Sequence, residues 1–315
     1  MTTASRAYAA LWTGVLLASC GGRPVSPLVD DAGDIAIREA SAGDAGTPGS
    51  WTTLPMGSFL MGSPLTELCR LENETLHAVT LTRPFTLAAT EVTRGSFASH
   101  MGYDPSQGVA CGAADCPVES ATWHDAVVYC NKLSEELGLE KCYTCVADSN
   151  GAIFPYTCAV RPEFSDAGKT VYDCPGFRLP TEAEWEYAYR ARSSTALYNG
   201  TIASCDDDAR VAAISWYNQN SGNLPHRVGG KLPNAWGLHD LAGNVMEWVN
   251  DAYVSDLGAE AAVDPVGGAG PSRVVRGGSF RSGAWSARAA RRNHNQAANA
   301  ESQIGFRCAR TLTGE

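Results

Sequence analysis

The most regular pattern of hydrophobic positions lies between Trp123 and Leu137, where apolar side chains recur every three or four residues. This spacing predicts an amphipathic helix. Thr122 precedes the pattern and Asp125 follows three positions later, which is the arrangement of a capping box, and Gly138 stands where a helix ends. We therefore predict one long helix in this part of the chain.

Two further helices are predicted from their first residues. Thr181 with Glu184 forms a second capping box, and Thr93 precedes a short apolar repeat that reaches Met101. On the helix that begins at Thr181, the residues expected on one buried face are Trp185, Ala188 and Tyr189.

Strands are predicted where apolar and polar residues alternate. Gly57–Ser63 alternates between glycines, and Thr80–Leu87 alternates around Pro84, which indicates an edge strand. The residues after 200 have the pattern of short strands and loops. Helices and strands mixed in this way predict an α+β domain with little regular secondary structure.

The segment Asn234–Trp248 has the pattern of a partly buried loop. Gly237 and Gly243 allow positive φ, and large apolar residues alternate with Asn and Asp side chains that cap turns. Asp240 and Glu247 place two carboxylates seven residues apart. Because Ca²⁺ takes carboxylate and carbonyl oxygens, this loop is a candidate site for a hard cation.

Residues 1–20 have the pattern of an export signal. One basic residue precedes an apolar run that is too short to cross a bilayer as a mature helix. The run ends in Leu17-Ala-Ser-Cys20, which resembles a bacterial lipobox, so we expect Cys20 to carry the lipid. The alternative is an ordinary signal peptide with a chance cysteine. With Gly21 next, the expected location is the outer membrane, in the cell envelope.

Residues 21–50 are rich in Gly, Ala, Asp, Ser and Pro, a composition that cannot bury enough apolar surface to offset chain entropy. We expect this stretch to be a flexible tether. Residues 51–315 form one domain, with a cysteine-rich insertion at residues 139–176.

The whole chain has a net charge of −10, and no feature indicates a nucleic-acid partner. Eight arginines nevertheless lie between Arg273 and Arg310. They could form a patch that binds anions. The alternative, which we favour, is that they pair with acidic residues upstream, because arginine is the usual cation of buried ion pairs. The upstream acids considered are Glu91, Glu182, Glu184 and Glu186.

Ten cysteines remain once Cys20 is set aside, and an even number in an exported chain predicts five disulfides. A zinc cluster built from Cys142, Cys145, Cys158 and Cys174 is the alternative that export argues against. The expected bonds are Cys111–Cys116, Cys145–Cys158, Cys142–Cys174 and Cys205–Cys308, leaving Cys69 and Cys130. The Cys145–Cys158 bond would clip the insertion into a hairpin, with Cys142–Cys174 behind it.

Seven stretches in the same order resemble the formylglycine-generating enzyme family, the sulfatase-modifying factors. They are Gly57–Ser63, Glu91–Arg94, Pro117–Ala126, Phe177–Tyr187, Asn234–Trp248, Arg276–Phe280 and Ile304–Cys308. The resemblance covers about residues 51–311. It implies the family's C-type-lectin-like α+β fold.

The resemblance breaks at the family's catalytic residues. Family members that make formylglycine hold copper(I) with two cysteines shortly after the Gly-Gly-Ser motif, and soft thiolates suit that ion. Here no cysteine occurs between Cys205 and Cys308, and the best-aligned positions are Ser282 and Ala287. No copper is therefore expected. Ser279 matches the family's active-site serine, whereas Met246 replaces a tryptophan usual in the family.

The resemblance also implies one structural Ca²⁺. Carried over position by position, its ligands are the side chains of Asp240 and Glu247 and the carbonyls of Gly243 and Val245. The alternative is that Asp240 caps a turn while Glu247 pairs with a C-terminal arginine. The family's other calcium site has no clear match, so we expect one ion only.

Three functions are consistent with these features. We favour a lipid-anchored, non-catalytic member of the family that binds a ligand or envelope partner through the lectin-like scaffold. The second is a metal-dependent oxidoreductase with reassigned chemistry, and formylglycine generation itself ranks last. The six histidines lack the His-x₃-His-x-Glu spacing of the family's iron-dependent sulfoxide synthases, and no nucleophile elbow supports a Ser-His-Asp hydrolase.

Overall fold

A computed structural model of the chain describes residues 49–107, 111–147, 156–166 and 168–312. The predicted lipid-attachment residue Cys20, the signal segment and nearly all of the tether lie outside these residues. None of the helices in the described part of the chain is both long and apolar enough to cross a membrane.

The three predicted helices are confirmed, and all three begin at the predicted caps. In α1 (Arg94–Met101) the Thr93 side chain accepts a hydrogen bond from the Ser96 amide. Both capping boxes form at the starts of α2 (Trp123–Glu136) and α3 (Glu182–Arg190). The remaining helical elements are α4 (Ala209–Ile214) and the short 3₁₀ turns η1 (Pro162–Phe164), η2 (Val171–Asp173) and η3 (Ala284–Ala287).

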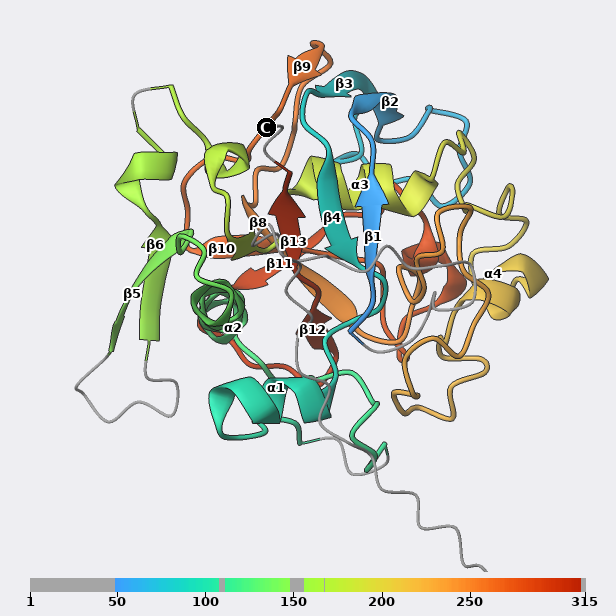
Figure 1. Cartoon of the computed structure of the whole chain (residues 1–315). Coiled ribbons are helices and arrows are strands. Elements are labelled where there is room, and N and C mark those ends of the chain that lie inside the picture. The colour runs from blue at the N-terminus through green and yellow to red at the C-terminus, as the bar shows by residue number, and fades with distance from the viewer. Residues whose placement is uncertain (1–48, 108–110, 148–155, 167, 313–315) are drawn as a thin grey trace, which may run out of the picture. The chain divides into compact units, whose positions relative to one another are not determined.

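The strands of the described residues form four small sheets, ordered β1-β4-β13-β7, β11-β10-β8-β12, β2-β3-β9 and β5-β6. Their bounds are β1 Trp51–Leu54, β2 Gly57–Met61, β3 His77–Leu81, β4 Phe85–Ala88, β5 Tyr143–Ala147, β6 Tyr156–Val160, β7 Phe177–Arg178, β8 Met246–Ala252, β9 Ala262–Val263, β10 Ser272–Arg276, β11 Asn293–Gln296, β12 Ile304–Phe306 and β13 Ala309–Thr311. Figure 1 shows them with the helices and long loops between them. The predicted α+β class is confirmed.

The strand predicted over Thr80–Leu87 is wrong. The chain instead forms β3 and β4, which lie in different sheets, and Pro84 sits in the turn between them. Each of the two strands has a neighbour on both sides, so neither is an edge. Proline carries no N–H for a ladder, and here it marks the break between strands.

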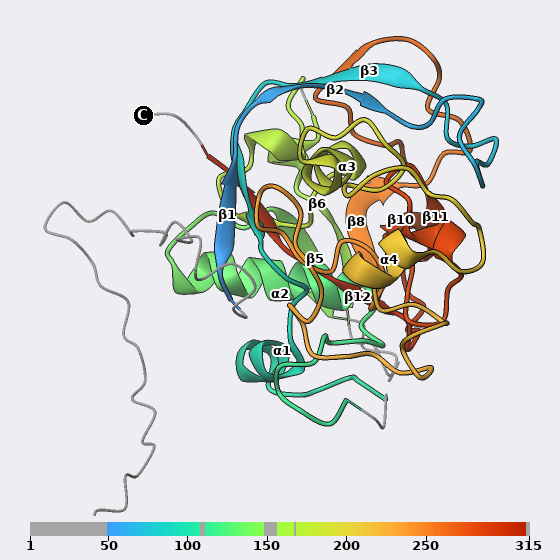
Figure 2. The same cartoon turned by 90° about the vertical axis from the view of Figure 1, so that its right-hand side faces the viewer.

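Helix α3 is buried on every side, and the expectation of one buried face is therefore too narrow. It lies between the β2-β3-β9 sheet and β8, as Figure 2 shows. Trp185 of α3 belongs to one hydrophobic cluster. Trp123 of α2 belongs to a second cluster, which also contains residues of β12. A helix buried all round can keep charged residues only if each is paired.

All ten cysteines outside the signal segment form disulfides, as predicted in number. Three pairings are confirmed: Cys111–Cys116, Cys145–Cys158 and Cys142–Cys174. The pairing of Cys205 with Cys308 is wrong, and so is the remainder pair of Cys69 with Cys130. The structure joins Cys130 to Cys308 and Cys69 to Cys205.

The corrected pairs follow from packing that spacing cannot reveal. Cys130 lies on the buried face of α2, and Cys308 follows β12 in the cluster that packs against this helix. The insertion behaves as expected, because β5 and β6 pair as a hairpin with Cys145 directly opposite Cys158. Figure 1 places this hairpin at the side of the molecule, next to α2.

Candidate functional site

The segment Asn234–Trp248 is a buried loop that enters β8, and its polar residues hold turns as predicted. The Asn234 side-chain oxygen accepts hydrogen bonds from the amides of Trp236 (3.0 Å) and Leu238 (3.2 Å). Gly243 has a φ of 76°, and a Cβ there would lie 2.0 Å from the Ser215 hydroxyl oxygen. Glycine is therefore required at this point of the loop.

Glu247, one of the predicted calcium ligands, is fully buried and bound to an arginine. Arg307 donates from Nη2 to Oε1 (2.7 Å) and from Nε to Oε2 (2.8 Å). Trp185 Nε1 donates to the same Oε2 at 2.8 Å. This arrangement is the alternative weighed against calcium, in which Glu247 pairs with a C-terminal arginine.

Asp240, the second predicted carboxylate ligand, lies near the same arginine. Asp240 is buried in left-handed backbone (φ 59°), and its Oδ2 accepts from the Gly229 amide at 2.6 Å. The amide of Gly243 donates to the carbonyl of Gly277, and the amide of Val245 donates to Glu91. Within the described residues, no group of three or more His, Cys, Asp or Glu side chains is placed to hold a metal ion.

Glu91 brings a third buried carboxylate to this region, which the sequence did not assign to the loop. It accepts from the Asn244 side chain (2.7 Å) and the Val245 amide (3.0 Å). Burial raises the pKa of Glu91 well above its usual range, and the nearby charges of Asp240 and Glu247 add to this. Burial likewise raises the pKa of Asp240, although the positive charge of Arg307 opposes the shift. Arg307 thus supplies a positive charge beside these carboxylates, and the calcium site stays a prediction.

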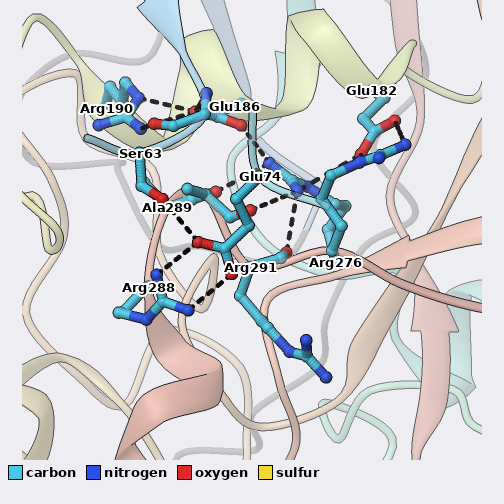
Figure 3. A network of polar contacts seen from close by, with 12 residues as sticks. Ser63, Glu74, Glu182, Glu186, Arg190, Arg276, Arg288, Ala289 and Arg291 are labelled. Carbon is cyan, nitrogen blue, oxygen red and sulfur yellow. Dashed lines mark hydrogen bonds and ion pairs between the residues drawn. The ribbon is translucent and has the colours of Figure 1, made fainter. Parts of the chain in front are cut away.

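Four of the eight C-terminal arginines, Arg276, Arg288, Arg292 and Arg307, form buried ion pairs, so the prediction favoured from the sequence is confirmed for half of them. Arg276 contacts Glu186 and Glu182, and Arg292 binds both oxygens of Glu182. Figure 3 shows Arg276 reaching from Glu186 toward the backbone carbonyls of Ala289 and Arg291.

Two acids that the sequence did not single out complete this network. Arg288 binds Glu74 through two hydrogen bonds (2.8 and 2.7 Å) and also Glu67 (2.8 Å). Glu74 accepts from the Ser63 hydroxyl as well, as Figure 3 shows. The partner of Glu184 is Arg178, which lies outside the C-terminal segment. These ion pairs hold loops together. Among the described residues, Arg281 is exposed and Arg273, Arg291 and Arg310 are partly exposed, and none of these four forms an ion pair.

The positions that match the family's catalytic residues form a hydrogen-bonded cluster without sulfur. The Ser279 hydroxyl donates to Gln303 Oε1 (2.8 Å) and lies 3.1 Å from the Ser282 hydroxyl oxygen. Ser279 is fully buried, whereas Ser282 is partly exposed. Ala287 is buried in η3, and its carbonyl accepts from Tyr189. Every cysteine of the described residues is in a disulfide, so no thiolate is available to bind copper(I).

A polar surface lies beside this cluster, and the sequence analysis missed it. Asn293 begins the edge strand β11 and its side-chain nitrogen lies 3.8 Å from the sulfur of Met246. Asn295, two residues on, donates to Glu301 and accepts from Asn299. We call the surface formed by Asn293, Asn295, Met246, Gln303 and Ser282 the amide face. The available signal was the pair Asn293 and Asn295 in the predicted strand region after Arg292. These residues are two positions apart, and alternate residues of a strand share one side.

Comparison with known proteins supports this assignment of motifs. Residues 39–312 match the model of the sulfatase-modifying factor enzyme 1-like domain. The formylglycine-generating enzyme of Streptomyces coelicolor is 32% identical over 288 residues, which cover 81% of this chain and 87% of that enzyme.

Other relatives match over a smaller share of their own length. The bovine formylglycine-generating enzyme is 34% identical over 42% of this chain and 39% of that enzyme. The serine/threonine-protein kinase pkn1 of Chlamydia pneumoniae is 32% identical over 46% of this chain, but only 24% of the kinase is covered. The chain therefore spans well under half the length of these two relatives.

Solved structures share the fold across most of the chain. Variable protein 1 of Treponema denticola superposes with a TM-score of 0.69 and 29% identity, covering 84% of this chain and 98% of that one. PvdO of Pseudomonas aeruginosa superposes with a TM-score of 0.61 and 24% identity, covering 83% and 94%, a likeness of fold. With the family model matched over residues 39–312 and the Streptomyces coelicolor enzyme covered over 87% of its length, the chain belongs to the formylglycine-generating enzyme and sulfatase-modifying factor family.

Proposed function

We propose that this chain is a non-catalytic, lipid-anchored member of its family that binds a polar ligand through the amide face. The observation that carries the proposal is the closure of all ten cysteines of the domain in disulfides, with Ser282 and Ala287 at the positions of the copper-binding pair. Hydroxyl and methyl groups do not hold copper(I), so the oxygen-activating step of the family has no metal site here.

Ser279 does not offer a substitute chemistry. A serine acts as a nucleophile when an adjacent base takes its proton. The Ser279 hydroxyl instead donates to the side-chain oxygen of Gln303, an amide that does not act as a base. Ser282, its other neighbour, is also a hydroxyl. The cluster is therefore suited to hydrogen bonding and not to proton transfer.

The amide face has the chemistry of a binding surface for uncharged polar ligands. Each Asn and Gln side chain has two donors and an acceptor, which suits hydroxyl and amide groups such as those of a glycan or a peptide backbone. Asn293 is exposed, and Gln303 and Ser282 are partly exposed. Met246 supplies an adaptable apolar contact among them.

The proposed location is the cell envelope, with Cys20 carrying the lipid and residues 21–50 as the tether. Such an anchor would let the domain reach a ligand at a distance from the membrane. Cys20→Ser should release the full chain from the membrane fraction into the soluble fraction. Unchanged partitioning of this variant would contradict the anchor and leave the binding proposal standing.

Binding is tested with the full chain on arrays of glycans and of uncharged peptides. We expect a defined set of positives whose signal falls at least tenfold when Asn293 and Gln303 are both replaced by Ala. Gln296→Ala is the matched control, because its side chain leaves β11 on the opposite side and contacts Ser272. Equal loss in the control, or full binding by the double variant, would place the ligand elsewhere.

A further inference from the structure

Arg273 differs from the paired arginines that follow it in the C-terminal segment. In the described part of the chain, no carboxylate lies within ion-pair distance of its guanidinium, whereas Arg276, Arg288, Arg292 and Arg307 each bind a glutamate. Nη1 of Arg273 donates to the Asn250 carbonyl (2.9 Å), and the guanidinium carbon lies 4.0 Å from the centre of the Trp123 ring. Its Nε is buried without a hydrogen-bond partner.

This lack of a partner is costly for a group held away from water. Burial lowers the pKa of Arg273, so the charged form is less favoured here than in solvent. A cation stacked on an aromatic ring recovers part of that cost, and a carboxylate opposite it would recover more. A guanidinium that lacks a carboxylate partner and lines a cavity therefore indicates a place for an anion.

A cavity of about 430 Å³ opens in front of Arg273, between the cysteine-rich insertion and the glycine-rich loop Gly267–Gly270. This volume lies within the usual range for small-molecule sites. Its walls combine apolar and polar side chains, which are Val160, Phe164, Val171, Val266, Thr170 and Lys169. The Cys142–Cys174 bond fixes the insertion that forms one wall.

The charges around the cavity are positive. Arg273 and Lys169 line it, and no Asp or Glu side chain does so among the described residues. Asp251 of β8, whose Oδ1 accepts from the Gly267 amide, lines a neighbouring cavity. The lining therefore offers two cations and an apolar wall to whatever enters.

We propose that this cavity is a binding site for a small organic acid that has one carboxylate and an apolar body. The carboxylate accepts from the guanidinium of Arg273 that lines the cavity and is attracted by Lys169 at the rim. The apolar body packs on Phe164, Val160 and Val266. No residue of the amide face lines this cavity, although Asn295 lies opposite Arg273 on the paired strands β11 and β10, and the proposal does not depend on the proposed function.

The probe is 3-phenylpropionate, with neutral 3-phenylpropionamide as its matched analogue, titrated into the full chain by calorimetry or ligand-observed NMR. We expect the amide to bind at least tenfold more weakly than the carboxylate, because the contact with Arg273 is charge-assisted. Equal binding of the two probes would overturn the proposal. Absence of binding by a panel of phenylalkanoates of different chain length would also overturn it.

Four variants separate the site from general effects on folding. Arg273→Met should weaken the carboxylate at least tenfold, and the exposed Lys169→Gln should weaken it two- to threefold. Ser165→Trp should block the cavity while leaving Arg273 in place, since Ser165 is an exposed lining residue. Arg227→Gln, an exposed arginine outside the lining, is the charge-matched control and should bind as wild type. Wild-type affinity in both Lys169→Gln and Ser165→Trp would overturn the proposal even if Arg273→Met fails to fold.

Discussion

Replacing Glu247 with Gln tests whether an arginine or a metal ion balances the central loop. Both Glu247 and Arg307 are fully buried, and the carboxylate accepts two hydrogen bonds from the guanidinium and one from Trp185. Gln keeps the shape but removes the charge, and its amide group points a donor at another donor. Removing one partner of a buried ion pair typically costs about 3–5 kcal/mol, because the remaining charge stays buried. We expect a loss of this size in the free energy of unfolding.

The measurement is urea unfolding of the full chain with its disulfides intact. Glu135→Gln is the matched control: Glu135 forms an ion pair with Lys141 at 2.7 Å, but the side chains are 59% and 43% exposed. An exposed pair contributes little, so this control should leave the free energy of unfolding close to the wild-type value. If Glu247→Gln costs no more than Glu135→Gln, the ion pair is not what holds the loop.

A chelator separates the two interpretations of Asp240 and Glu247. With Arg307 as the balancing charge, EDTA should leave the melting temperature of the wild type unchanged. The calcium prediction expects the opposite: EDTA lowers the wild-type melting temperature, Glu247→Gln no longer responds to EDTA, and elemental analysis finds about one calcium per chain. Those three results together would restore the calcium site.

Two further predictions concern stability. Burial and the nearby charge of Glu182 raise the pKa of Asp251 to about 7, so its contribution to stability is present below about pH 4 and is lost as the pH rises through 7. Unfolding of Asp251→Asn and wild type at pH 4 and pH 8 should show the variant gaining about 4 kcal/mol on wild type, and a pH-independent difference would contradict the shift. Replacing both Cys130 and Cys308 with Ala should lower the free energy of unfolding by up to about 5 kcal/mol, because their bond closes a loop of 178 residues. Replacing both Cys111 and Cys116, which are 5 residues apart, should lower it by about 2 kcal/mol. Equal losses in the two double variants would show that loop length does not govern the effect.

Local signals in the sequence predicted the helices because capping depends on residues three positions apart. Thr122 with Asp125 and Thr181 with Glu184 form their capping boxes in the structure. The hairpin of the insertion and its two disulfides were also predictable, since the cysteines concerned are separated by 13 and 32 residues. Long-range pairing was not. Cys130 meets Cys308 only because β12 packs against α2, a contact that no local pattern contains.

The candidate site shows the same division. The family motifs located Ser279 and the loop around Gly243, and the missing thiolates were visible in the sequence. Arg307 could be foreseen only as one of eight arginines. Its choice of Glu247 depends on β12 lying parallel to β8, with Gly305 opposite Glu247. The amide face was missed because the polar residues of an edge strand do not form a hydrophobic pattern. That these residues belong to one surface becomes visible only when the fold places Asn293 next to Met246.

The most direct test of the central claim is a turnover assay on the family's own reaction. The full chain is incubated with a peptide containing Cys-x-Pro-x-Arg, with and without added copper(I), and a catalytically active family member is run alongside as a positive control. Because no thiolate is available at Ser282 or Ala287, we predict that mass spectrometry will detect only the unmodified cysteine peptide in both conditions. Conversion of the cysteine to the aldehyde above the no-enzyme control would contradict the claim that this chain is a non-catalytic binding protein.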